Sequence, residues 1–264
     1  MKKVSDIATQ IVNDIKNEAS DSNKPKGLCI GFESIDEFTH GLNGGDLIVL
    51  ASRPEVGKTT LALQIALNVS SISKKTVAYF SFENSNEELA QRLLGISSGI
   101  DSNMISKEKI LRHELDQIIS GAKNLINIPI YINDNHGLLL PELYEESLKL
   151  KNESNLDLII VESLGFIIGD KELNTRRSEQ IDKILEDLKK MAREINCPII
   201  LLSALSKSVD TRPNKRPTLK DFIIHSHAVK EIADIILFIY REDVYVLSST
   251  SPTPLSFHSS DTSL

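Results

Sequence analysis

Ser-Arg-Pro-Glu-Val-Gly-Lys-Thr, residues 52–59, is the stretch of this sequence that decides the fold. The apolar run 46–51 before it indicates a buried strand, and the apolar spacing over 60–66 after it indicates a helix. Strand, loop and helix in this order are the context of a phosphate-binding loop, whose backbone N–H groups point at phosphate oxygens. The stretch departs from the pattern G-x-x-x-x-G-K-[ST] at its first position, where Ser52 replaces glycine.

This loop pattern gives individual residues expected roles in binding ATP and Mg²⁺. Lys58 is expected to reach the β- and γ-phosphates, and the Thr59 hydroxyl is expected to ligate Mg²⁺. The alternative is a surface turn that contains Gly-Lys by chance, and the flanking strand and helix argue against it. The residues expected to hold the nucleotide are Ser52, Arg53, Pro54, Glu55, Val56, Gly57, Lys58, Thr59 and Thr60.

Composition limits the class of protein. The 264 residues are enough for one large α/β domain or two small ones, and the 41% hydrophobic content is ordinary for a globular chain. A net charge of −7 excludes a wholly basic nucleic-acid coat, although a local basic path remains compatible with it. Cys29 and Cys197 suggest neither a disulfide framework nor a zinc site. We expect a cytoplasmic protein with no membrane partner, because no apolar run is long enough to span a bilayer.

The body of the sequence alternates strand and helix patterns. Its strands are continuously apolar, which indicates a mostly parallel central sheet with helices on both faces, and nucleotide sites in such sheets lie at the carboxyl ends of the strands. The expected strands are 46–51, 76–82, 129–132, 156–161, 198–203 and 233–239, and the expected helices are 58–70, 85–97, 107–124, 141–152 and 177–195.

Two segments flank this body. Apolar residues at three-and-four spacing over 4–15 predict an amphipathic helix, which a polar connector joins to the body. Its apolar stripe is expected either to fold back on its own domain or to dock on a neighbouring subunit. The predicted organisation is a linker helix and connector over 1–26, an ATPase domain over 27–245, and a Ser/Thr/Pro-rich, disordered tail over 246–264.

Two carboxylates stand where a nucleotide hydrolase needs them. Glu162 ends the apolar strand 156–161 and is expected to support Mg²⁺ through water. Glu83 ends strand 76–82 at the same edge of the sheet and is the candidate base that activates water. The alternative for Glu162 is a solvated acid at a strand end.

A basic loop follows strand 198–203. Its prolines predict an irregular segment, and a basic loop beside a nucleotide site can follow a phosphate backbone. An ordinary solvated loop has the same charge pattern, so the alternative stays open. The candidate DNA-binding residues are Lys207, Arg212, Lys215 and Arg216.

Several stretches besides the loop carry motifs of their own: Gly31-Phe32-Glu33-Ser34-Ile35-Asp36, Gly44-Gly45-Asp46-Leu47, Phe80-Ser81-Phe82-Glu83, 202–207 and Phe238-Ile239-Tyr240-Arg241. Together with Arg53-Pro54 and Gly57-Lys58-Thr59 they resemble the C-terminal, RecA-like motor domain of DnaB-type replicative helicases over residues 4–245. The wider RecA and RadA recombinases are similar in fold but lack this combination of motifs.

The resemblance implies a P-loop ATPase of DNA replication that translocates 5′ to 3′ on single-stranded DNA. It also implies a hexameric ring with ATP bound between subunits, in which the N-terminal helix packs against the adjacent subunit. By resemblance Glu83 activates water.

Four departures from the family pattern bear on activity. Glu162 stands where the family has Asp, and Ala204 stands where it has a Gln that links the γ-phosphate to the DNA loops. The run 223–226 lacks the charges of the family's Arg-Glu-Ser-Gly, and the family's arginine-finger hairpin would fall beyond Tyr245. Nucleotide binding with slow hydrolysis and impaired unwinding is therefore expected.

The leading hypothesis is a DnaB-like helicase motor domain. The second is a truncated paralogue, catalytically weak, that binds ATP and regulates or joins a complete helicase ring. A third is a recombinase-like filament former.

Overall fold

A central sheet organises the part of the chain that the structure describes, in the strand order β3-β2-β4-β5-β1-β6-β7. The computed structural model describes residues 3–5, 8, 9, 12, 26–105, 110–165, 167, 177–222, 226–244 and 256–259. The strands are β1 (Leu47–Ser52), β2 (Thr76–Ser81), β3 (Ile130–Asn133), β4 (Leu156–Glu162), β5 (Ile199–Ala204), β6 (Ile235–Tyr240) and β7 (Ser256–Ser259).

The strands β1 to β6 pair in parallel, so their carboxyl ends meet at one edge of the sheet. The register between β1 and β5 runs from Leu47 opposite Ile199 to Ser52 opposite Ala204. Burial along nearly all of β1, β2 and β5 accounts for their mainly apolar sequences, because helices cover both faces. The predicted α/β fold with a mostly parallel sheet is confirmed, and these six strands begin and end within two residues of the predicted bounds.

The last strand, β7, lies within the segment 246–264 for which the sequence predicts disorder. It pairs antiparallel with β6, with Leu237 opposite Ser259. For these four residues the prediction of disorder is wrong, because the edge of β6 offers backbone hydrogen bonds that do not depend on an apolar pattern. The remainder of this segment lies outside the described residues.

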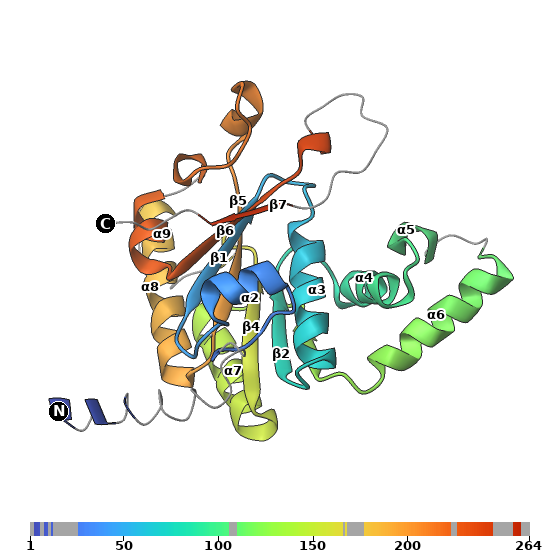
Figure 1. Ribbon diagram of the computed structural model, residues 1–264, viewed down its shortest axis with the longest axis horizontal. Coiled ribbons are helices and arrows are strands. Elements are labelled where there is room, and N and C mark those ends of the chain that lie inside the picture. Colours follow the sequence, from blue (N-terminus) through green and yellow to red (C-terminus); the bar gives the residue numbers. More distant parts are fainter. Residues whose placement is uncertain are drawn as a thin grey trace.

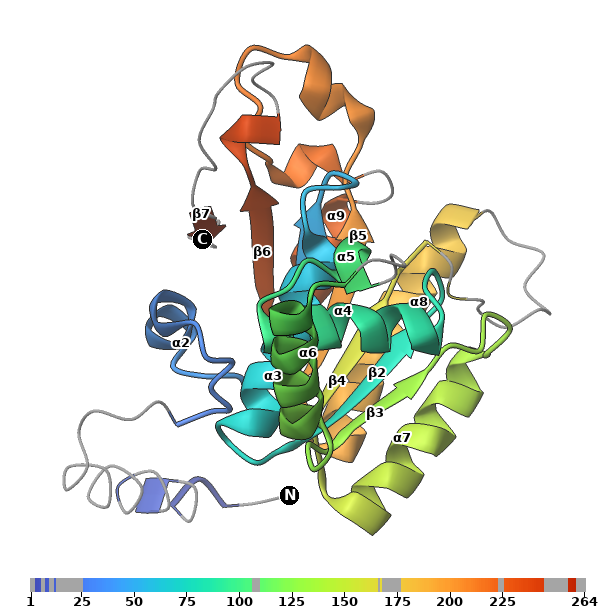
Figure 2. The same cartoon turned by 90° about the vertical axis from the view of Figure 1, so that its right-hand side faces the viewer.

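Two apolar cores lie on opposite faces of the sheet, because alternate side chains of each strand point to opposite faces. Ile48 and Leu50 face the core that α2, α3 and α4 cover, whereas Leu47 and Val49 face the core under α7, α8 and α9. Figure 2 shows α2 and α3 on one side of the sheet and α7 and α8 on the other. The helices are α2 (Glu33–Thr39), α3 (Lys58–Ser71), α4 (Asn86–Ser98), α5 (Ser102–Ile105), α6 (Arg112–Leu125), α7 (Leu140–Ser154), α8 (Arg177–Ile195) and α9 (Ser226–Ile232).

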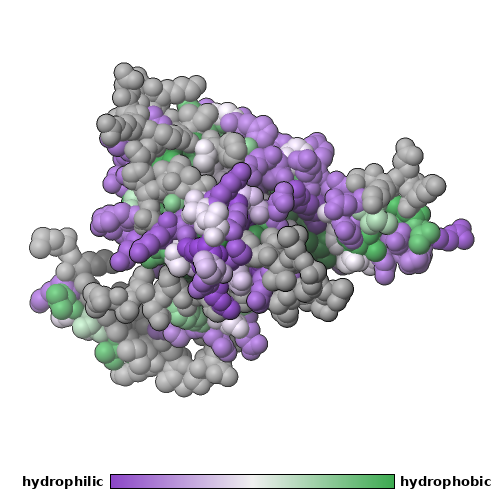
Figure 3. All heavy atoms as spheres, turned by 90° about the horizontal axis from the view of Figure 1, so that it is seen from above, coloured by the Kyte–Doolittle hydropathy of each residue, from purple (hydrophilic) through white to green (hydrophobic). Residues whose placement is uncertain are grey.

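Helices α5 and α6 project from the body of the domain (Figure 1). Helix α6 begins at Arg112, later than the predicted residue 107, and the backbone N–H of Leu111 donates to the Glu114 carboxylate at 2.7 Å. This bond satisfies a backbone donor at the start of the helix and so fixes where the helix begins. Leu115 and Ile119 are exposed on α6, and apolar atoms gather on the projecting arm in Figure 3.

The predicted N-terminal helix over 4–15 lies largely outside the described residues. Val4 and Val12, which are described, are both exposed. Among the helices of the described ranges, none has the length and apolar character that crossing a membrane requires.

Candidate nucleotide-binding site

The loop between β1 and α3 lies at the carboxyl edge of the sheet (Figure 1). Glu55 and Gly57 both have positive φ angles, 66° and 109°, which turn the backbone sharply into the helix. Gly57 is the N-cap of α3, and a helix leaves its first N–H groups without partners inside the helix. The N-terminal end of α3 therefore presents backbone donors and a positive dipole end, both of which suit a phosphate.

The most specific contact of the site joins this helix to the end of β4. The Thr59 hydroxyl donates a hydrogen bond to Oε1 of Glu162. Glu162 is fully buried, and β4 presents it next to Ser81 of β2 in the sheet register. Thr59 and Glu162, predicted separately from a loop motif and a strand end, thus come together as a hydroxyl–carboxylate pair.

The other carboxylate oxygen of Glu162 is also hydrogen-bonded. Oε2 accepts from the Tyr79 hydroxyl at 3.0 Å and from the Asn84 amide at 3.2 Å, with the Ser81 hydroxyl at 3.4 Å. The Arg92 guanidinium, on α4, donates to the carbonyl oxygen of Asn84 at 3.1 Å. Burial, and after it the negative charge of Glu162, raises the pKa of Tyr79 well above 10. The hydroxyl therefore stays protonated and acts as a donor.

Sequence reasoning missed Tyr79, Asn84 and Arg92. One signal was available: Tyr79 and Ser81 alternate along β2, so their side chains share one face of the strand beside β4.

Glu83, the candidate base, lies two residues beyond the end of β2 and is exposed. The N–H of the preceding Phe82 donates to the backbone oxygen of Glu162 at 2.7 Å, so the chain enters this turn beside the end of β4. The His136 ring nitrogen Nδ1 lies 3.0 Å from the backbone oxygen of Phe82 and supports the same turn. Glu83 therefore lies in the turn after β2, beside the end of β4 that carries Glu162. Lys58 begins α3 and is partly buried.

The remaining predicted loop residues differ in what they contact. The Arg53 guanidinium forms an ion pair with Asp210 at 2.7 Å and donates to the backbone oxygen of Leu205 at 2.7 Å. Hydrogen bonding from Arg53 lowers the pKa of Asp210. Ser52 is buried, and its hydroxyl donates to the backbone oxygen of Arg53. The other members of the loop are buried Val56 and exposed Pro54, Glu55 and Thr60.

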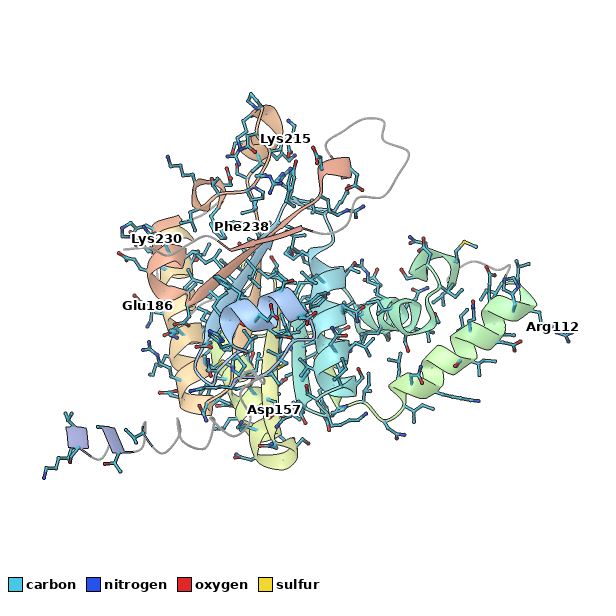
Figure 4. The ribbon with its side chains drawn as sticks, viewed as in Figure 1. Arg112, Asp157, Glu186, Lys215, Lys230 and Phe238 are labelled. Carbon is cyan, nitrogen blue, oxygen red and sulfur yellow. The ribbon has the colours of Figure 1, made fainter. Side chains whose placement is uncertain are left out.

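The basic loop lies at the same edge of the molecule, with Lys215 near its tip (Figure 4). It contains the short 3-10 helices η1 (Lys207–Thr211) and η2 (Leu219–Asp221). Arg212 binds the buried carboxylate of Asp221 through both terminal nitrogens, at 2.7 and 2.8 Å. Lys215 donates to the backbone oxygen of Asp210 at 2.8 Å, and Arg216 lies over the Tyr240 ring. Lys207 is exposed.

The profile of the DnaB-like helicase C terminal domain matches residues 27–259. This chain belongs to that family. The DnaB-like domain is 34% identical over 244 residues to the replicative DNA helicase DnaB of Geobacillus stearothermophilus, covering 92% of this chain and 54% of that protein. It is 33% identical over the same length to the replicative DNA helicase DnaC of Bacillus subtilis. The chain spans about half the length of these curated relatives.

Solved structures resemble this DnaB-like domain over nearly its full length. One of them, an ATPase domain, superposes with a TM-score of 0.88 at 26% identity, covering 98% of this chain and 95% of that one. A DnaB-like replicative helicase, described with its interactions with primase, gives a TM-score of 0.86 at 27% identity over 98% of this chain and 64% of that one. The RecA-like fold expected from the sequence is thereby confirmed.

Proposed function

We propose that this DnaB-like domain binds ATP with Mg²⁺ at the loop 52–60 and hydrolyses it to move 5′ to 3′ along single-stranded DNA in the cytoplasm. The observation that carries the proposal is the contact between Thr59 and Glu162. It joins a phosphate-binding helix end to a buried carboxylate, the two parts that a nucleotide–magnesium site requires.

The donor set fits Mg²⁺, a hard cation that prefers oxygen ligands. The Thr59 hydroxyl would ligate the ion, and Oε1 of Glu162 would hold it through water. Bound Mg²⁺ would offset the negative charge on the phosphates. Lys58 would neutralise further charge on the β- and γ-phosphates, and the N–H groups that begin α3 would orient them.

Glu83 is proposed to orient and deprotonate the attacking water. Its exposure and its place in the turn after β2, beside the end of β4, support this role, since a base must reach solvent on the phosphate side of the site.

The basic loop is proposed to face the DNA backbone through Lys207, Arg212, Lys215 and Arg216. The exposed ammonium of Lys207 would make the more direct contact, because the charge of Arg212 is already balanced by Asp221. A ring, formed with copies of this chain or with a complete helicase, would bring several such loops to one strand of DNA.

A second candidate, a nucleotide-dependent regulator that joins a complete helicase ring, is favoured by one observation. Ala204 ends β5 directly opposite Ser52, between the nucleotide loop and the basic loop. Its methyl group offers no hydrogen bond that could link bound nucleotide to a DNA contact.

ATP turnover with and without single-stranded DNA tests both candidates. Lys58→Ala should weaken ATP binding by about 10- to 100-fold, because it removes hydrogen bonds from a charged group. The exposed Lys149→Ala on α7 is the matched control and should leave binding unchanged. Turnover that DNA stimulates supports the motor, whereas tight binding without stimulation supports the regulator. Equal ATP affinity of Lys58→Ala and the parent protein would refute the nucleotide site.

A further inference from the structure

The two carboxylate oxygens of Glu162 have different surroundings. Oε1 accepts from Thr59 at the phosphate-binding end of α3. Oε2 points the other way, toward donors that come from β2 and the turn after it, Tyr79 and Asn84. One oxygen is thus directed to the proposed metal, and the other is held by the protein.

The Tyr79 donor is fixed by burial. Its side chain is fully buried in β2, the strand that pairs with β4, and the hydroxyl reaches Oε2 at 3.0 Å. The hydroxyl donates to a carboxylate oxygen, and a hydrogen bond to a charged acceptor is stronger than one between neutral groups.

The Asn84 donor is fixed by Arg92. A guanidinium can only donate, so the atom of Asn84 that lies 3.1 Å from Arg92 must be the carbonyl oxygen. The amide nitrogen of Asn84 then faces Oε2 of Glu162 at 3.2 Å. A chain of hydrogen bonds therefore runs from α4 through the turn after β2 to the end of β4, and it continues through Oε1 to Thr59 on α3.

We propose that Tyr79 and Asn84 are positioning residues for Mg²⁺ binding, which hold Oε2 of Glu162 so that Oε1 stays directed at the Thr59 hydroxyl. A glutamate has one more rotatable bond than an aspartate, so its carboxylate can turn away from a metal unless one oxygen is anchored. The two donors supply that anchor. The inference rests on the proposed nucleotide–magnesium site. It adds which residues allow a glutamate, rather than an aspartate, to support Mg²⁺ there.

The hydrogen bonds to Oε2 should matter only while residue 162 is a glutamate. In Glu162→Asp the carboxylate withdraws by one methylene group and leaves the reach of the Tyr79 hydroxyl. Loss of that hydroxyl should then have no further effect. Tyr79→Phe and Glu162→Asp should therefore be non-additive, as expected for residues in one hydrogen-bond network.

The test is binding of a fluorescent ATP analogue to the full chain, titrated with Mg²⁺ and repeated without it. Tyr79→Phe keeps the ring but removes the donor, and it should raise the Mg²⁺ concentration for half-maximal binding about tenfold, the effect of one hydrogen bond to a charged group. Binding without Mg²⁺ should not change. Tyr131→Phe, which removes an exposed hydroxyl from β3, is the matched control and should leave both values unchanged.

Further variants separate the outcomes. Asn84→Ala should shift the Mg²⁺ dependence in the same direction, and it carries the test if Tyr79→Phe does not fold. The inference is overturned if folded variants keep the Mg²⁺ dependence of the parent, or if Tyr79→Phe has an equal effect in the Glu162→Asp background. Absence of Mg²⁺-dependent binding in the parent protein itself would overturn the proposed function, and this inference with it.

Discussion

Replacing Arg212 with alanine is expected to lower the free energy of unfolding by about 3 kcal/mol at pH 7. The structure explains the size of this effect. The side chain of Asp221 is 3% exposed, and Arg212 binds both of its carboxylate oxygens, so truncation leaves a buried charge without its cation. The value lies at the low end for a broken buried pair, because Thr218 still donates its N–H and hydroxyl to Asp221 and because Arg212 is itself partly exposed.

The pH dependence of this effect follows from Asp221. Burial alone would raise the pKa of this carboxyl, but hydrogen bonds from Arg212 and Thr218 outweigh burial and lower it from its usual 3.8. A carboxyl whose pKa is lower in the folded state than in the unfolded state stabilises the fold fully above the unfolded pKa. That contribution is lost as the pH falls through the folded pKa. The difference between parent and variant should therefore be constant from neutral pH to about pH 5 and shrink below about pH 4.

Urea denaturation followed by circular dichroism measures both quantities. The exposed Lys207→Ala removes a positive charge from the same loop and should change stability by less than about 0.5 kcal/mol. An Arg212→Ala variant as stable as Lys207→Ala would refute the reasoning. If the reasoning holds, weaker DNA binding by Arg212→Ala would include the effect of the broken pair with Asp221 as well as any lost phosphate contact.

Two further predictions concern buried groups. Ser147→Ala on α7 should raise the free energy of unfolding by about 1 kcal/mol, because the fully buried Ser147 hydroxyl has no hydrogen-bond partner within the described chain. Unchanged or lower stability in urea denaturation would contradict this prediction. Burial raises the pKa of both thiols, that of Cys197 to about 12, and only Cys29 is partly exposed. A thiol-reactive dye at pH 8 should therefore label Cys29 alone in the native protein and both cysteines in urea. Two labels per native chain would show that Cys197 is accessible.

The parts of the site that depend on neighbouring residues in the chain could be predicted from the sequence. β1, the loop and α3 follow one another directly along the chain, so a local motif predicts them. Glu162 could be assigned because it ends a long apolar run. The partners of Glu162 could not be predicted. Tyr79 and Asn84 meet it only because β2 pairs with β4 in one particular register, and no local pattern specifies that register.

Charge alone was an insufficient guide to the basic residues. The positions of Arg53 and Arg212, in a phosphate-binding and a basic stretch, predict contacts with nucleotide and DNA. The structure pairs them with Asp210 and Asp221, and whether they also touch a ligand stays a prediction. The pairing of Arg53 depends on chain folding over 157 residues, which a reading of local sequence cannot supply.

The ion pair between Arg53 and Asp210 belongs to two loops at once, one proposed for nucleotide and one for DNA. A ligand that favours one arrangement of this pair changes the affinity of the other loop when the second ligand also binds the two arrangements with different affinity. Thermodynamic linkage requires the exchange to be symmetrical: the factor by which nucleotide alters DNA affinity equals the factor by which DNA alters nucleotide affinity. If nucleotide and DNA both distinguish such arrangements, a single arginine couples the two proposed loops in both directions.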